Sequence, residues 1–147
     1  MRKRPKYKQG VFKPKNLHKY NGDVDKIIYR SGLELKFFNF LDNNKNILKW
    51  SSEEVVVPYI SLDGKIHRYF LDIWAKVKTK NGAIKEFIGE IKPEVFTKAP
   101  KKPKRMTRQW KEKYKTYLIN QAKWDSAKKF AEKKGWKFEL LTENDIL

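Results

Sequence analysis

The chain has 147 residues, a length that suits one domain, and no internal repeat suggests a second. Its 35 Lys and Arg against 17 Asp and Glu give a formal net charge of +18, yet 39% of the residues are hydrophobic and 14% aromatic, enough for a core and against wholesale disorder. With no cysteine and only His18 and His67, the sequence excludes disulfides, thiolate nucleophiles and a three-histidine zinc site, so any metal should be a hard, oxygen-bound cation.

The first twenty residues are strongly basic. They contain eight Lys or Arg and no acid, so we expect a basic N-terminal arm over 1–20 and one domain over 21–147. Apolar runs are shorter than the roughly 20 residues of a membrane span, and no signal-peptide core follows the basic start. We therefore expect a soluble, intracellular protein.

A helix is predicted after the arm. An extended piece over 27–29 leads to Ser31, which begins a helix that runs to about Asn43. Apolar side chains recur along this helix at helical spacing and form its buried face: Leu33, Phe37, Phe40 and Leu41.

Two roles are open for Glu34 in this helix. Ser31-x-x-Glu34 is the pattern of a capping box, in which Glu34 accepts a hydrogen bond from the Ser31 amide. Glu34 also lies in line with Phe38 and Leu41 at the border of the buried stripe, and from there its carboxylate would point across the sheet towards Asp72.

Three strands follow the helix. The β-branched run 53–60 is joined by an Asp63-Gly64 turn to an alternating strand over 66–77, and an Asn81-Gly82 turn leads to a third strand over 84–92.

A second helix and a fourth strand complete the chain. A basic, proline-containing stretch over 98–105 precedes a helix over roughly 108–134, which Gly135 ends, and a strand follows at 136–141. This order favours a parallel return of the last strand to the same sheet. We therefore predict an α/β fold with an αβββαβ core, in which helices flank a mixed four-stranded sheet.

Two basic segments suit a nucleic acid. Besides residues 1–20, residues 98–115 contain nine Lys or Arg against one acid. Clustered cations neutralise phosphates and release counterions, whereas neither segment has the apolar stripe of a membrane-bound helix. A solvated tail is the alternative. Aromatic residues interleave the cations, where they either stack on bases or anchor the segments to the core: Tyr7, Phe12, Trp110 and Tyr114.

The turn between the second and third strands decides which side chains face each other. A two-residue loop would set Asp72 opposite Ile91, whereas a three-residue loop over 80–82 sets Asp72 opposite Glu90. The longer loop also pairs apolar residues with apolar residues and opposite charges with each other. We therefore predict the longer loop, with Asp72, Glu90 and Lys92 on one face of the sheet.

Two facing carboxylates repel each other and need a counter-charge. Mg²⁺ would supply it, with Asp72, Glu90 and the backbone carbonyl of Ile91 as oxygen ligands. Lys92 would position or deprotonate a water and offset charge on a phosphorane, while the cation polarises the phosphoryl oxygen. The alternative is an ordinary exposed strand face.

These residues resemble the signature of the PD-(D/E)xK nuclease superfamily, with Glu34 on the first helix, Asp72 on the second strand and Glu90-x-Lys92 on the third. Leu71 stands where that signature has Pro. Over roughly 15–147 the chain resembles more closely the head-completion nucleases of contractile-tailed bacteriophages, and more distantly the endonuclease subunit of heteromeric transposons. The segments that carry this likeness are Ile28-Tyr29-Arg30-Ser31-x-x-Glu34-Leu35-Lys36, Ser52-Glu53-Glu54-x-x-Val57-Pro58-Tyr59, His67-Arg68-Tyr69-Phe70-x-Asp72, Glu90-Ile91-Lys92-Pro93 and Asn120-x-Ala122-Lys123-Trp124.

The resemblance implies a restriction-endonuclease-like fold and a DNA endonuclease whose catalytic residues are Glu34, Asp72, Glu90 and Lys92. It implies Mg²⁺ as cofactor, with Mn²⁺ as a substitute. The enzyme would act on double-stranded phage genome ends after packaging, in the virion or the host cytoplasm, with capsid, portal or neck proteins as partners. The alternatives are a non-catalytic DNA-binding structural protein of the head vertex and a transposon or repair nuclease of the same fold. The side chains expected to bind DNA are Arg2, Lys3, Arg4, Lys6, Lys8, Lys101, Lys102, Lys104, Arg105, Arg108 and Lys123.

Overall fold

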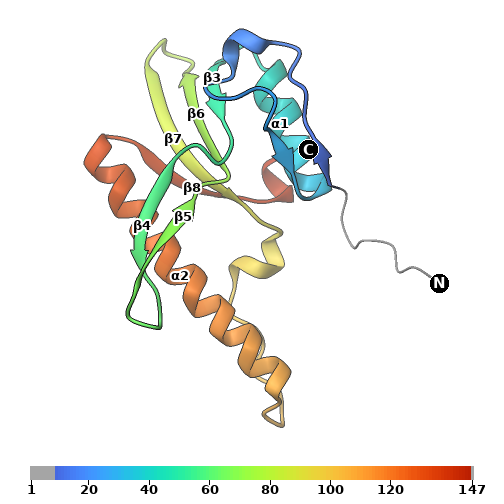
Figure 1. Cartoon of the computed structure of the whole chain (residues 1–147), viewed down its shortest axis with the longest axis vertical. Coiled ribbons are helices and arrows are strands. Elements are labelled where there is room, and N and C mark those ends of the chain that lie inside the picture. Colours follow the sequence, from blue (N-terminus) through green and yellow to red (C-terminus); the bar gives the residue numbers. More distant parts are fainter. Residues whose placement is uncertain (1–8, 147) are drawn as a thin grey trace, which may run out of the picture.

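A four-stranded sheet forms the centre of the computed structural model, which describes residues 9–146 (Figure 1). The strand order is β3-β6-β7-β8, and the strands are antiparallel except for the parallel pair β7 and β8. The predicted α/β class and mixed four-stranded sheet are confirmed. The four strands are β3 Ile47–Ser51, β6 Ile73–Lys78, β7 Ile84–Ile91 and β8 Lys137–Leu141.

Each face of the sheet packs against one helix. Ile73 belongs to the apolar cluster formed with α1 (Gly32–Asn43), whereas Ile88 belongs to the cluster formed with α2 (Arg108–Lys134). Because successive residues of a strand point to opposite faces, Glu90 lies on the α2 side with Ile88. No helix within residues 9–146 is both long and apolar enough to cross a membrane.

The first strand of the sheet differs from the predicted one. The run 53–60 forms β4 (Val56–Ile60), which pairs with β5 (Ile66–Phe70) in a separate two-stranded sheet. Strand β3 was not among the predicted strands. A register shift between Ile47 and Lys49 breaks the alternation that would have revealed β3. The expected strand over 66–77 is interrupted at Leu71 and Asp72, between β5 and β6.

The hairpin between β6 and β7 has the predicted register. Ile73 pairs with Gly89, and the Thr79 N–H donates a 2.8 Å hydrogen bond to the Ala83 carbonyl across the three-residue loop. Gly82 has φ +84°, the left-handed conformation that this loop requires.

The described part of the predicted arm packs on the domain. Strand β1 (Gly10–Val11) pairs with β2 (Ile28–Tyr29), and the ring of Phe12 lies 5.8 Å from the ring of Trp50. Phe12 is buried, so it anchors the chain instead of stacking on bases. Residues 9–20 are thus part of the folded unit. The expected DNA-binding residues Arg2, Lys3, Arg4, Lys6 and Lys8 lie outside the described residues.

Lys19 shows why this segment is not a free basic arm. It ends the short helix η1 (Leu17–Lys19) and is only 8% exposed. Its ammonium donates three 2.8 Å hydrogen bonds, to the backbone carbonyls of Leu41, Asp42 and Asn44 at the end of α1. Burial lowers the pKa of Lys19, and the Asp42 carboxylate opposes that shift. The Lys19 ammonium therefore stabilises the folded structure at the end of α1.

Replacing Lys19 with Met should leave the three carbonyls without their donor. We expect a loss of about 2–3 kcal/mol in unfolding free energy and a melting temperature lower by roughly 5–10 °C, measured by circular dichroism. Lys13→Met, at an exposed position of the same segment, is the control and should change little. A melting temperature equal to wild type in Lys19→Met would contradict this role.

Candidate active site

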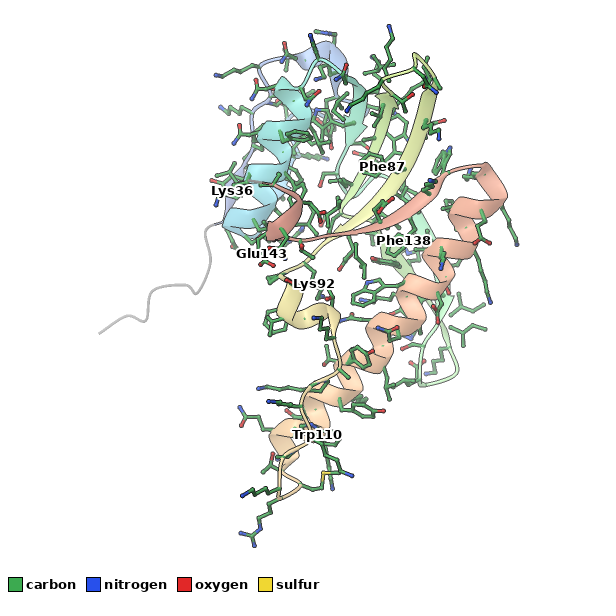
Figure 2. The ribbon with its side chains drawn as sticks, turned by 180° about the vertical axis from the view of Figure 1, so that it is seen from behind. Lys36, Phe87, Lys92, Trp110, Phe138 and Glu143 are labelled. Atoms are coloured by element: carbon green, nitrogen blue, oxygen red, sulfur yellow. The ribbon has the colours of Figure 1, made fainter. Side chains whose placement is uncertain are left out.

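Three of the predicted catalytic residues meet where β6 begins and β7 ends. Asp72 occupies the bend directly before β6, and Glu90 lies near the end of β7. Lys92, labelled in Figure 2, follows that strand. The Ile91 N–H donates a 2.8 Å hydrogen bond to Asp72 Oδ2. Lys92 Nζ lies 3.7 Å from Glu90 Oε1. The hairpin register therefore brings two carboxylates and one ammonium into a single cluster.

The surroundings of Asp72 disfavour the ionised form of its carboxyl group. The pKa of Asp72 is raised well above its usual value, first because the carboxyl is desolvated and next because of the nearby Glu90 charge. The charge of Glu34 acts on Asp72 in the same direction. Glu34 itself has a pKa raised mainly by burial. The helix therefore brings its acid into the electrostatic field of the strand carboxylates.

Glu34 also takes part in the start of α1. The Glu34 N–H donates to Ser31 Oγ at 3.1 Å, which makes Ser31 the N-cap. The Ser31 hydroxyl in turn lies 3.2 Å from Glu34 Oε2 and donates to it. Glu34 thus contributes its amide to the cap, while its carboxylate is held by the Ser31 side chain.

An ion pair ties the start of α1 to the chain before Asp72. Arg30 pairs with Glu53, whose backbone has the uncommon positive φ of +57°. The Glu53 N–H donates a 3.0 Å hydrogen bond to the carbonyl of Leu71, the neighbour of Asp72. This pair therefore links the segments that carry Glu34 and Asp72.

Tyr69 is a site residue that the sequence reasoning did not assign. Its hydroxyl donates a 2.5 Å hydrogen bond to Glu90 Oε2, on the carboxylate whose other oxygen faces Lys92. Burial, and next the charge of Glu90, raise the pKa of Tyr69, so the phenol keeps its proton. The signal was its position on an alternating strand, three residues before Asp72, but its contact with Glu90 requires the bend between β5 and β6.

Replacing Tyr69 with Phe should remove one hydrogen bond that orients Glu90. In the metal-dependent nuclease that the sequence predicts, outer-shell partners of ligand carboxylates typically matter 10- to 100-fold. We therefore expect cleavage to fall about tenfold and the divalent-cation concentration for half-maximal cleavage to rise. Titration of cleavage against Mg²⁺ measures both. Tyr59→Phe is the control, because the ring of Tyr59 lies next to that of Tyr69. A lower melting temperature with an unchanged cation requirement would show that Tyr69 is merely structural.

Lys123 lies beside the cluster instead of on the distant basic surface. Its ammonium sits over the rings of Tyr69, at 5.5 Å, and Tyr59, at 5.8 Å. It reaches them from α2, whose Trp124 packs in the same apolar cluster. A phosphate bound beside Glu90 would therefore be near Lys123 of α2 as well as Lys92, which follows β7.

The remaining expected DNA-binding residues within the described part surround the start of α2. All of them are exposed, and the Arg108 guanidinium pairs with Glu112 at 3.3 Å. They belong to the stretch that follows β7, so they continue directly from Lys92 along the chain. These residues are Lys101, Lys102, Lys104, Arg105 and Arg108.

The donor set suits a hard divalent cation. Asp72 and Glu90 offer carboxylate oxygens, and burial together with the nearby Glu90 charge raises the pKa of Asp72. Within residues 9–146 no three His, Asp or Glu side chains lie close enough to bind one ion together. Two carboxylates, a backbone carbonyl and several waters match the preference of Mg²⁺, which binds few protein ligands.

Comparison with known proteins extends this picture. Residues 44–143 match the family model described as TnsA-like endonuclease N terminal. The chain is also 43% identical over 142 residues to the Head completion nuclease of Enterobacteria phage T4, an alignment that covers 93% of this chain and 92% of that protein. No solved structure matches.

Proposed function

The chain belongs to the TnsA-like endonuclease family, and from that premise we propose that it is a Mg²⁺-dependent DNA endonuclease that acts on phage genome ends during head completion. The observation that carries the chemistry is the cluster of Asp72, Glu90 and Lys92 at the junction of β6 and β7. The setting follows from the T4 relative, whose name describes a head completion nuclease.

The reaction is hydrolysis of a phosphodiester. A water oxygen bonds to phosphorus, one P–O ester bond breaks, and the departing oxygen takes up a proton. Lys92 would lie beside this water. As an ammonium it would orient the water and offset charge on the phosphorane, and as a neutral amine it would accept the proton of the water. Glu34, Asp72 and Glu90 are the acids of the site, and Tyr69 orients Glu90.

Mg²⁺, with Mn²⁺ as a substitute, would be held by Asp72, Glu90 and the carbonyl of Ile91, and would polarise the phosphoryl oxygen. Double-stranded DNA is the partner that the net charge of +18 favours. Capsid, portal or neck proteins would be neighbours of the enzyme, in the virion or in the host cytoplasm.

A plasmid-nicking assay tests this function. Wild-type protein should convert supercoiled plasmid to nicked or linear forms with Mg²⁺ and not with EDTA, and Glu90→Ala should be inactive. Cleavage by Glu90→Ala at the wild-type rate, or by wild type in EDTA, would overturn the proposal.

The basic stretch after β7 should set the salt dependence of binding. If Lys101, Lys102 and Lys104 contact phosphates, changing all three to Gln should flatten the slope of log affinity against log salt by about 0.9 for each phosphate that is no longer neutralised. Fluorescence anisotropy with a duplex in EDTA measures the slope. The same change at three exposed lysines late in α2, namely Lys128, Lys129 and Lys133, should leave it unchanged. Equal slopes in wild type and the first variant would indicate that the stretch only improves solubility.

Deleting residues 2–8 tests the N-terminal cations in the same way.

A further inference from the structure

A groove beside the catalytic cluster is not explained by duplex cleavage. It lies between the first half of α2 and the segment over 93–107, which we call the strap, and has a volume of about 710 Å³. One end is at Lys92, and the strap begins with the short helix η2 (Glu94–Thr97). Figure 2 shows Trp110 on the part of α2 that projects beyond the sheet, below Lys92. The groove therefore leads from the cluster along a projecting part of the molecule.

Aromatic rings form a stack on this part of α2. Trp110 and Tyr114 are parallel within 9° at a centroid distance of 5.1 Å, and Tyr114 and Tyr117 follow at 6.3 Å and 27°. Their spacing of four and three residues puts the three rings on one helix face. Trp110 and Tyr117 line the groove, and Tyr114 is 39% exposed. Trp110 Nε1 is buried without a hydrogen-bond partner in the described part of the chain.

The groove is also positively charged. Four lysines line it: Lys101 and Lys113, together with Lys98 and Lys92, which pair with Glu94 and Glu90. The lining acid, Glu112, is paired with Arg108. Rings among cations are the combination that binds unpaired nucleotides, because bases stack on the rings while the backbone follows the cations.

A duplex cannot use these rings in the same way. Its bases are already stacked on each other, so only its phosphates meet a protein that stays outside the grooves. A single strand exposes both faces of each base. The volume of the groove lies in the range of about 300–1,000 Å³ that holds a drug-sized molecule, which includes a nucleotide.

Both ends of the strap are fixed, so the groove exists before DNA arrives. The Glu94 N–H donates a 2.8 Å hydrogen bond to Glu143 in the short helix η3 (Glu143–Asp145), which follows β8. At the other end, the hydroxyl of Thr107 accepts a 3.1 Å hydrogen bond from the backbone N–H of Trp110 and caps α2. In a preformed site, less free energy is lost to ordering of the protein when the DNA strand binds.

From these observations we propose that the strap groove binds an unpaired stretch of DNA and guides it to Lys92, so that the preferred substrate carries a single-stranded segment beside the cut, as in a flap, a gap or a frayed end. This inference rests on the proposed endonuclease function for the cleavage step. The binding step stands independently of it.

Binding in EDTA tests the groove without cleavage. Fluorescein-labelled oligothymidylate of about 12 nucleotides, within the usual site size, is compared with a blunt duplex by anisotropy. Trp110→Ala should lower the ratio of oligothymidylate affinity to duplex affinity at least fivefold, Trp110→Phe should retain it, and Lys129→Ala, far along α2, is the control. Melting temperatures verify that each variant is folded.

Cleavage of a flapped and a blunt duplex in Mg²⁺ completes the test. Wild type should prefer the flapped substrate, and Trp110→Ala should lose that preference. An unchanged affinity ratio and unchanged preference would overturn the inference. Selective oligothymidylate binding without any cleavage would instead contradict the endonuclease function and leave the groove as a single-strand site.

Discussion

Replacing Asp72 with Asn should abolish cleavage while making the cation-free protein more stable. The Asn side chain has nearly the same shape, and its oxygen still accepts the hydrogen bond from the Ile91 N–H. The change removes one charge from the electrostatic centre of the site, so we expect at least a hundredfold loss of Mg²⁺-dependent nicking.

The stability gain follows from the raised pKa of Asp72. An acid whose pKa is higher in the folded protein favours folding when protonated, and that contribution is lost as the pH rises through the folded pKa. Near neutral pH this contribution is diminished or lost, so Asp72 lowers the stability of the cation-free fold relative to acidic pH. Asp72→Asn should melt a few °C higher than wild type in EDTA at pH 7.5, with the difference vanishing as the pH falls towards 4.

Two further measurements make this prediction specific. Mg²⁺ should raise the melting temperature of wild type and not of Asp72→Asn, because a ligand stabilises only the state that binds it. Asp125→Asn, at an exposed position of α2, should leave both nicking and melting unchanged. If Asp72→Asn were less stable than wild type at neutral pH, the carboxylate would be compensated within the protein, and the argument for a cation would fail.

The sequence was sufficient to predict the pairing of β6 with β7, which places Asp72 near Glu90, because that pairing is local. Residues 72 and 90 are joined by a short hairpin, and cross-strand matching of charge and size selects one register. The positive φ of Gly82 agrees with the same choice. When the connection is short, a one-residue change of loop length reverses every face, so the correct pattern is easily distinguished from its alternative.

The features that were missed depend on distant contacts. Strand β3 gains its place from pairing with β6, which lies far along the chain, and its register shift hides the alternation. Lys19 looks like any other cation of a basic segment, but the carbonyls at the end of α1 determine its burial. A count of charges includes such a lysine among the cations available to DNA. Its burial becomes evident only from the folded structure.

Glu34 shows how one residue can satisfy a local and a distant role together. Its amide serves the N-cap of α1, whereas its carboxylate acts on Asp72 across the sheet. The hydrogen bond from the Ser31 hydroxyl to Glu34 Oε2 fixes the direction of that carboxylate. The two roles use different atoms, so separate substitutions can test them.

Replacing Glu34 with Gln should therefore lower Mg²⁺-dependent cleavage at least tenfold with little change in melting temperature. The backbone cap is untouched, and an amide oxygen still accepts from Ser31, but the charge near the strand carboxylates is lost. Ser31→Ala is the matched variant, because it removes the cap acceptor and the donor to Glu34 Oε2 but keeps the Glu34 charge, and it should cost about 1 kcal/mol of stability. It should retain more activity than Glu34→Gln when both are assayed well below their melting temperatures. Equal activity of Glu34→Gln and wild type would restrict Glu34 to helix capping, and the acids of the site would be Asp72 and Glu90 alone.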